Sequence, residues 1–211
     1  MAKIKICGVT RLADFRLAQR CGADFIGFVF APGSPRRIDP ETARRIAAAA
    51  PHRSRRVGVF VNEGPRLVRE IYRHAGLDLV QLHGEEDPAY CRALGLPYWK
   101  AFAAADGAFL GMLHRYDCRT ILLDGGDGAG RGGTGRTFDW SFAALAMKTG
   151  RRVVVAGGVA ADNVAGLLRL GPYAVDVCSS LERRPGVKSP QKVARFFRAL
   201  REGDFPRGGV K

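Results

Sequence analysis

Eight short runs of apolar and β-branched residues recur along the chain, and each is separated from the next by a segment long enough for one helix. Successive runs begin 20 to 32 residues apart, which is the room that a crossover helix between two parallel strands requires. The expected strands are residues 3–7, 24–30, 56–61, 77–82, 97–102, 120–124, 152–156 and 174–178. Helical spacing, often opened by a capping residue or a first-turn proline, is clearest at residues 41–50, 65–75, 162–170 and 190–200.

Eight strand–helix units predict a single-domain α/β fold, the (β/α)8 or TIM barrel. The length of 211 residues lies near the lower bound of about 200 for this fold, so we expect one barrel over residues 1–202 and no second domain. Residues 203–211 carry Pro, Gly and charge without periodicity, and we expect them to form a frayed C-terminal tail. The alternative is an open doubly wound sheet, which usually has fewer strands and a nucleotide-binding fingerprint after the first.

The composition indicates a cytoplasmic protein without a membrane partner. No stretch approaches the roughly 18 to 20 uninterrupted apolar residues that a transmembrane helix needs. The first ten residues alternate Lys with Ile instead of forming the apolar block of a signal peptide. Five cysteines, an odd number with no CxxC pair and no Cys/His cluster at zinc spacing, favour free thiols over a disulfide framework or a structural metal.

The formal net charge of +14 is compatible with nucleic acid, acidic lipid or an anionic small molecule as partner. The basic residues stand mostly as pairs, as at residues 36–37, 44–45, 55–56 and 151–152, and no block of five or six with interleaved aromatics occurs. This pattern does not predict a dedicated nucleic-acid surface.

A barrel of this class has its active site at the carboxyl ends of its strands, so the polar residues there are the candidates. Cys7 ends the first strand beside Gly8; it can act as a base or nucleophile, or simply be a small buried packing residue. Asp124 ends the sixth strand, where a carboxyl either caps the next turn or exchanges protons with a ligand. The glycine-rich loop Gly125–Gly135 follows, and we interpret it as a lid over the mouth.

The ends of the seventh and eighth strands have the character of a phosphate site. Gly157 and Gly158 allow close backbone approach to a ligand, and Ser179 and Ser180 offer hydroxyls and amides at the usual place for phosphate in this fold. Two ordinary turns are the alternative. Arg36, after the second strand, is either a surface arginine or a bidentate ligand for a planar carboxylate.

Taken together, these motifs resemble the phosphoribosylanthranilate isomerase family of tryptophan biosynthesis. The resemblance spans nearly the whole chain and rests on segments in the family's order and spacing: KICGVT, FIGFVFAPGSPRRI, VGVFVN, VQLHGEE, LLD, GGTGRTFDW, VAGGVAADNV and VDVCSSLERRPGVKS. Eight ordered matches are far more specific than any one of them.

The resemblance implies roles for the strand-end residues. Cys7 is the general base, Asp124 the general acid, Arg36 the ligand of the anthranilate carboxylate, His83 a residue lining the pocket, and Gly157, Gly158, Ser179 and Ser180 the phosphate site. The family usually shows two serines, then glycine, after its VDV segment, so Cys178-Ser179-Ser180 places Ser180 where that glycine stands. If the backbone there needs a positive φ, the serine is strained.

The implied reaction is the Amadori rearrangement of N-(5′-phosphoribosyl)anthranilate to 1-(2-carboxyphenylamino)-1-deoxyribulose 5-phosphate, without metal or organic cofactor. Asp124 protonates the furanose ring oxygen, the ring opens to a Schiff base, and the Cys7 thiolate takes the C2′ proton. Free Asp titrates near about 3.9 and free Cys near about 8.5, so both groups act away from their resting forms.

Two other functions remain alternatives. Another phosphosugar enzyme of the same fold, such as an epimerase or the indole-forming synthase, needs metal ligands or a catalytic lysine at the strand ends. A basic nucleic-acid-binding module predicts affinity that falls steeply with salt and survives loss of Cys7. For the isomerase we expect the phosphorylated anthranilate-ribose substrate as partner and a monomer or homodimer.

Overall fold

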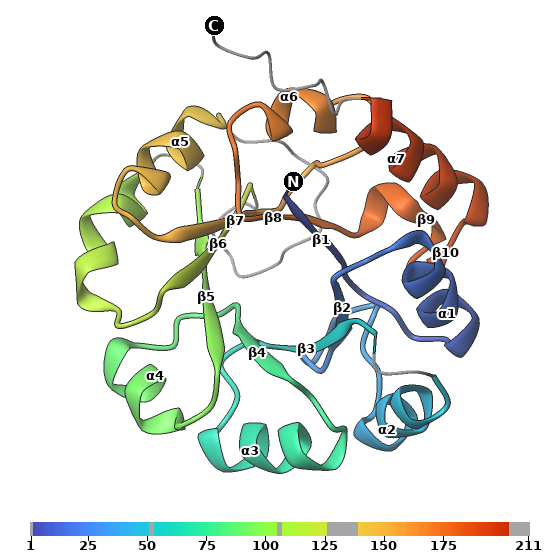
Figure 1. The fold of residues 1–211 in the computed structure, drawn as a ribbon. Coiled ribbons are helices and arrows are strands. Elements are labelled where there is room, and N and C mark those ends of the chain that lie inside the picture. The colour runs from blue at the N-terminus through green and yellow to red at the C-terminus, as the bar shows by residue number, and fades with distance from the viewer. Residues whose placement is uncertain (1, 51–52, 105–106, 126–138, 203–211) are drawn as a thin grey trace, which may run out of the picture.

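The computed structural model describes residues 2–50, 53–104, 107–125 and 139–202. Eight parallel strands follow one another in chain order and close into a barrel, with β8 paired to β1 (Figure 1). The predicted TIM barrel is confirmed, and the open doubly wound sheet is wrong. The strands are β1 (Lys3–Ile6), β2 (Phe25–Val29), β3 (Arg55–Phe60), β4 (Leu79–Leu82), β5 (Tyr98–Ala103), β6 (Thr120–Asp124), β7 (Arg152–Val155) and β8 (Ala174–Val177).

Helices surround the strands in the ribbon view of Figure 1. They are α1 (Leu12–Cys21), α2 (Pro40–Ala48), α3 (Pro65–His74), α4 (Pro88–Leu94), α5 (Ser141–Met147), α6 (Val164–Leu168) and α7 (Pro190–Glu202). Their starts follow the predicted signals: α2 begins with a first-turn proline after Asp39, whose Oδ1 accepts a hydrogen bond from the Thr42 amide at 2.8 Å.

Two elements differ from the expected pattern of strands and α-helices. The connection from β5 to β6 is a 3₁₀ helix, Ala108–Arg115. A small antiparallel hairpin, β9 (Glu182–Arg184) with β10 (Val187–Lys188), lies between β8 and α7. Gly186, with φ of 76°, forms its turn. A hairpin of this size has too few residues for a period-2 pattern to predict it.

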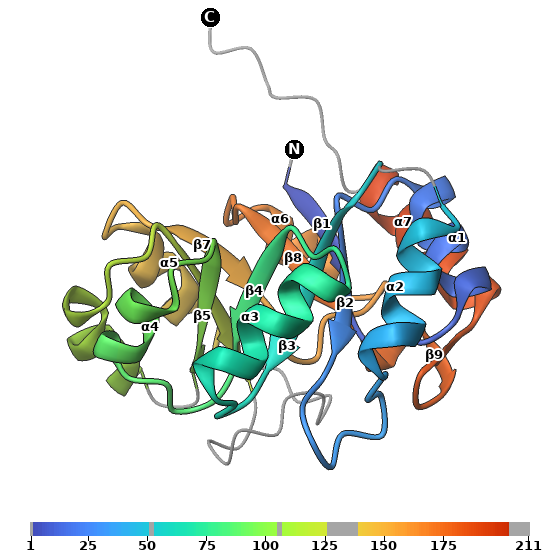
Figure 2. The same cartoon turned by 90° about the horizontal axis from the view of Figure 1, so that it is seen from below.

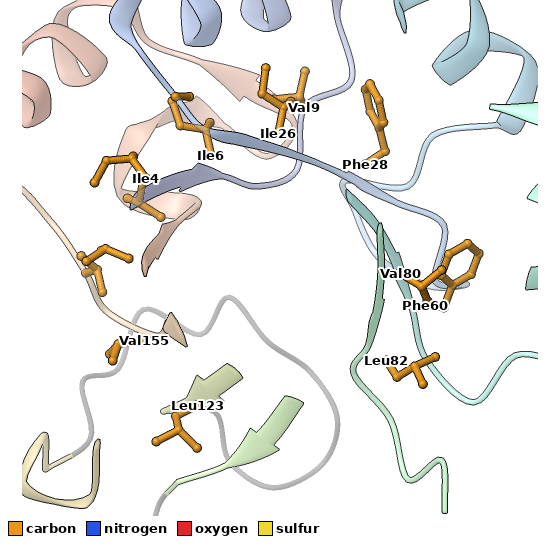
Figure 3. Close-up of a cluster of buried hydrophobic side chains, with 14 of the residues drawn as sticks. Ile4, Ile6, Val9, Ile26, Phe28, Phe60, Val80, Leu82, Leu123 and Val155 are labelled. Atoms are coloured by element: carbon orange, nitrogen blue, oxygen red, sulfur yellow. The ribbon is translucent and has the colours of Figure 1, made fainter. Parts of the chain in front are cut away.

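Alternation along the strands builds two separate apolar regions. Ile4 and Ile6 of β1, with Phe28, Leu82 and Leu123 of other strands, lie on the outer face against the helices (Figure 3). The inner face is filled by a second cluster: Phe25, Val57, Leu79, Trp99, Ala101, Leu122, Val154, Ala156 and Ala174. The interior is therefore a packed core, and a ligand can reach it only at the ends of the strands.

Within the described part of the chain, no helix is long and apolar enough to cross a membrane. The predicted tail, residues 203–211, and most of the predicted lid, Gly125–Gly135, lie outside the described residues. The last described helix ends at Glu202, where the predicted barrel ends.

Candidate active site

The predicted site residues gather at the carboxyl end of the barrel. Cys7 follows β1, Asp124 ends β6, and the paired glycines and serines follow β7 and β8. The segment after β2, which carries Arg36, and the β9 strand project on the same side of the barrel (Figure 2). Cys7 is 8% exposed and Asp124 7% exposed, so both are nearly buried and face a restricted space.

Cys7 lies in surroundings that favour its anion. Its pKa is lowered well below the ordinary value, first by a hydrogen bond from the Cys178 thiol and then by the nearby Lys5 and Lys188 ammonium groups, against the opposing effect of burial. Cys7 also belongs to a small inner cluster with Val29, Ala31 and Val59. Cys7 therefore packs in this cluster, and its lowered pKa distinguishes it from an inert buried thiol.

A buried ion pair lies on the amino-terminal side of Cys7, between β1 and β8, and the sequence analysis did not predict it. Lys5 Nζ is 2.6 Å from Asp176 Oδ2, and Lys5 is fully buried. Burial raises the pKa of Asp176, although Lys5 acts against it. Burial also opposes the charge of Lys5, but Asp176 and Cys7 outweigh it and raise the lysine's pKa. The sequence of β1 does indicate an inward-facing lysine. Lys3, Lys5 and Cys7 alternate with the isoleucines, so they point to the face opposite the isoleucines.

Replacing Lys5 with methionine is expected to lower the free energy of unfolding by about 3 to 5 kcal/mol at pH 8, because Asp176 then keeps a buried charge without its partner. The loss should be smaller at pH 5. The pKa of Asp176 is raised in the folded state, whereas in the unfolded chain an aspartate loses its proton above about pH 4. Between these two pKa values the folded variant binds a proton that the unfolded chain does not. The free energy of unfolding of the variant therefore falls as the pH rises.

Urea unfolding at both pH values checks this, with Lys3→Met, which removes an exposed lysine from the same strand, as the control. An equal loss for Lys5→Met at both pH values would contradict the assignment.

Asp124 is linked to His83 at the end of β4. His83 Nε2 lies 3.3 Å from Asp124 Oδ2, and Nδ1 lies 2.6 Å from the Gln81 side-chain amide nitrogen. His83 thus lies at the carboxyl end of the barrel, and its ring joins Asp124 to Gln81. Gln81 Oε1 is buried without a hydrogen-bond partner among the described residues.

Arg36 has a protein partner that the sequence did not predict. Its Nε lies 3.0 and 3.1 Å from the two carboxylate oxygens of Glu182, and Nη2 lies 2.8 Å from Oε2. Glu182 also accepts from Lys188 Nζ at 3.0 Å. The bidentate geometry expected for a substrate carboxylate is here made with Glu182, which orients the guanidinium and leaves its Nη1 out of these bonds.

The turns after β7 and β8 meet at the mouth. Gly157 and Gly158 have positive φ, 76° and 63°. A Cβ on Gly157 would come within 2.4 Å of the Gly125 amide nitrogen, so only glycine fits there. Ser179 and Ser180 begin a 3₁₀ turn, Ser179–Leu181, and the Ser180 hydroxyl donates to the Val159 carbonyl at 2.6 Å. Among the described residues only Asn62 is a non-glycine with positive φ, so Ser180 is not strained.

A closed (β/α)8 barrel that gathers a thiol of lowered pKa, a carboxyl and an arginine beside two small-residue turns, all at the carboxyl ends of its strands, has the architecture of a TIM-barrel enzyme. The family model described as N-(5′-phosphoribosyl)anthranilate isomerase matches residues 4–199. The chain belongs to this family, and it is an isomerase of tryptophan biosynthesis.

Relatives and solved structures agree with the family model. The N-(5′-phosphoribosyl)anthranilate isomerase of Citrifermentans bemidjiense is 47% identical, over 93% of this chain and 96% of the relative. The phosphoribosyl anthranilate isomerase structure from Thermus thermophilus is 41% identical with a TM-score of 0.85, covering 95% of this chain and 98% of that one. A third structure, 36% identical with a TM-score of 0.85 and covering 96% and 100%, is an isomerase in complex with reduced 1-(o-carboxyphenylamino)-1-deoxyribulose 5-phosphate.

Proposed function

We propose that the mouth of the barrel carries out the Amadori rearrangement of N-(5′-phosphoribosyl)anthranilate, with Cys7 as general base and Asp124 as general acid. The observation that carries the proposal is the environment of Cys7, where a hydrogen bond from Cys178 and two ammonium groups stabilise the thiolate. Asp124 stands three strands away round the barrel, and Asp176 interacts electrostatically with both groups. A base and an acid thus lie at the same end of the barrel.

In the first step, Asp124 protonates the ring oxygen of the ribose, and the ring opens to a Schiff base. Asp124 must carry a proton for this role, and His83 Nε2, 3.3 Å from Asp124 Oδ2, is placed to exchange one with it. If the Gln81 amide is turned, its Oε1 accepts a hydrogen bond from Nδ1–H of His83. Side-chain amide orientation and histidine tautomers are assigned from hydrogen-bond networks. The turned amide gives the buried Gln81 Oε1 a partner, which supports this arrangement.

In the second step, the Cys7 thiolate takes the C2′ proton of the protonated Schiff base, which leaves an enolamine with a C1′=C2′ double bond. C1′ then gains a proton and the C2′ hydroxyl loses one, which gives the ketose product. The hydrogen bond from Cys178, with Lys5 and Lys188, lowers the pKa of Cys7 and so favours the thiolate that this step needs. Each proton-transfer group of this kind contributes about 10²- to 10⁴-fold to the rate.

The remaining site residues hold the two anionic ends of the substrate. Arg36, aligned by Glu182, binds the anthranilate carboxylate, and the turns at Gly157-Gly158 and Ser179-Ser180 bind the phosphate. The complex of a relative with reduced 1-(o-carboxyphenylamino)-1-deoxyribulose 5-phosphate supports a ligand that carries both groups. The cytoplasmic location and the state as a monomer or homodimer stay predictions.

Replacing Arg36 with methionine is expected to raise KM by about 30- to 1,000-fold, or about 2 to 4 kcal/mol, because a buried substrate carboxylate loses its cation. The value of kcat should change little, since this contact acts in the ground state and the transition state alike. Steady-state kinetics and a thermal melt check the variant. Arg44→Met, which breaks an exposed arginine–carboxylate pair of the same geometry with Glu41, is the control. A collapse of kcat with unchanged KM would mean that Arg36 has another role.

Dialysis against a chelator is expected to leave turnover unchanged, because the proposed chemistry uses side chains alone. Within the described ranges, no group of three His, Cys, Asp or Glu side chains is placed to hold a metal ion. The fluorescence of the anthranilate substrate, followed with and without chelator, tests both this point and the proposed function. Loss of turnover that a divalent ion restores would exclude the metal-free mechanism.

The buried lysines favour the isomerase over a lysine-dependent enzyme of the same fold. Lys5, Lys100 and Lys188 are each ion-paired with a buried carboxylate, at 2.6, 3.1 and 3.0 Å. A lysine whose ammonium group is already held by a buried carboxylate is poorly placed to act as a nucleophile, which needs a free amine. The nucleic-acid alternative predicts binding that survives Cys7→Ser, whereas turnover of the anthranilate substrate does not.

A further inference from the structure

Cys178 is a second thiol beside Cys7, and the proposed mechanism uses it only as a hydrogen-bond donor. β1 and β8 are parallel neighbours with Ile6 opposite Val177, and the Cys7 amide donates to the Val177 carbonyl at 3.0 Å. The two cysteines are therefore the next pair in the register. Neighbouring strands lie about 4.8 Å apart, and a disulfide spans Cα atoms about 4.4 to 6.8 Å apart.

The side chains of the two cysteines also meet. Their thiols share a hydrogen bond, and both belong to the same inner cluster at the mouth. Glycines give each sulfur its space: a Cβ on Gly27 would come within 2.8 Å of Cys7 Sγ, and one on Gly8 within 3.0 Å of Cys178 Sγ. The register and the packing place two sulfurs face to face.

Cations lie beside both sulfurs, although Cys178 Sγ also lies 3.9 Å from the Glu182 carboxylate oxygen Oε1. Lys188 Nζ is 3.8 Å from Cys178 Sγ and 3.1 Å from the Cys178 carbonyl oxygen. Arg36 interacts electrostatically with both sulfurs, and Lys5 with Cys7. Cations of this kind activate a thiol toward oxidants, because the thiolate is the reactive form. Cys7 differs in this from the other four cysteines: burial raises the pKa of Cys21, Cys91 and Cys118, and the hydrogen bond with Cys7, together with burial, raises the pKa of Cys178.

We propose that Cys7 and Cys178 form a site of reversible oxidative modification by a peroxide, in which Cys7 is oxidised first and Cys178 is the resolving thiol. The Cys7 thiolate attacks one peroxide oxygen, the O–O bond breaks, and hydroxide leaves, which forms the sulfenic acid. Cys178 then loses its proton and attacks the Cys7 sulfur. The S–O bond breaks, hydroxide leaves, and the S–S bond forms. The two thiols supply two electrons and two protons, and hydrogen peroxide is reduced to two waters.

The disulfide removes the base that the proposed function needs, and it also protects Cys7 from irreversible oxidation to the sulfinic acid. A dithiol reductant restores both thiols. The loss of activity rests on the proposed function of Cys7, whereas the disulfide itself does not. Activity and covalent structure are therefore measured separately.

The test treats the whole protein with hydrogen peroxide in the absence of substrate, then with dithiothreitol. For the wild type we expect activity to fall by about ten-fold or more and to return with the reductant. Peptide mapping of the oxidised protein should show Cys7 joined to Cys178, with the loss of two hydrogen atoms. In Cys178→Ser, peroxide should inactivate the enzyme without recovery, and Cys7 should carry two added oxygens. Cys21→Ser is the control and should behave as the wild type.

Three results would overturn the proposal: no Cys7–Cys178 peptide in the oxidised wild type, a disulfide between other cysteines, or equal recovery in Cys178→Ser. The mapping needs no variant, so it decides the question even if Cys178→Ser fails to fold. A Cys7–Cys178 disulfide with full activity would support the modification site and contradict the proposed base instead.

Discussion

Replacing Cys7 with serine is expected to lower kcat by about 10²- to 10⁴-fold at saturating substrate, or about 3 to 5 kcal/mol of barrier. Serine keeps the size and the hydrogen-bonding capacity of the side chain, but its hydroxyl has a far higher pKa. The cations that lower the pKa of the Cys7 thiol cannot hold an alkoxide at neutral pH. Cys7→Ser should therefore cost nearly as much as Cys7→Ala.

The control for this variant is Cys21→Ala, which removes a half-buried thiol at the end of α1. Its kcat should stay within a few-fold of the wild type, measured with the same fluorescence assay. A thermal melt of each variant separates lost chemistry from lost folding. Turnover of Cys7→Ser near the wild-type rate would mean that the thiol only packs and that the base lies elsewhere.

The second large effect is expected for Asp124→Asn, whose kcat should fall by a similar factor of about 10² to 10⁴. The asparagine keeps the shape and can still hydrogen-bond to His83, but it has no proton to give to the ring oxygen. Because the chain has no other described carboxyl at the end of β6, no neighbour on that strand can replace it.

Asp117→Asn is the matched control for Asp124→Asn. Asp117 is exposed and precedes β6, so it stands at the opposite end of the same strand. We expect this variant to keep the wild-type kcat. If Asp124→Asn also turned over at the wild-type rate, ring opening would need a different acid, and His83 would be the first candidate to examine because it lies 3.3 Å from Asp124.

The fold could be predicted from the sequence because its signals are local and repeated. Each strand is an apolar run and each connection has room for one helix, and a parallel order then follows from the crossover length alone. The carboxyl-end rule for barrels brings Cys7 and Asp124 to one mouth, although they are far apart in the chain. The β9–β10 hairpin and the 3₁₀ helix Ala108–Arg115 were missed, because short irregular connections carry no periodic pattern.

Side-chain pairing within the site could not be predicted in the same way. Arg36 and Glu182 are 146 residues apart in sequence, and Lys5 and Asp176 are 171 apart. The hydrophobic pattern of the sequence places each residue in a strand or at its end. Which charged side chains form ion pairs depends on their rotamers and on the paths of the loops. Whether Ser180 is strained could also be decided only from the structure. The backbone at Ser179–Leu181 forms a 3₁₀ turn, which needs no positive φ, and residue spacing in the sequence does not predict this turn.

The most direct test of the proposed mechanism is the binding of the reduced, non-rearranging product analogue to Cys7→Ser, measured by calorimetry beside the wild type. If Cys7 transfers a proton and does little else, the analogue should bind with a Kd within a few-fold of the wild-type value, while turnover is almost lost. If the Kd weakens as much as kcat falls, Cys7 holds the substrate instead of acting on it, and the assignment of the general base is contradicted.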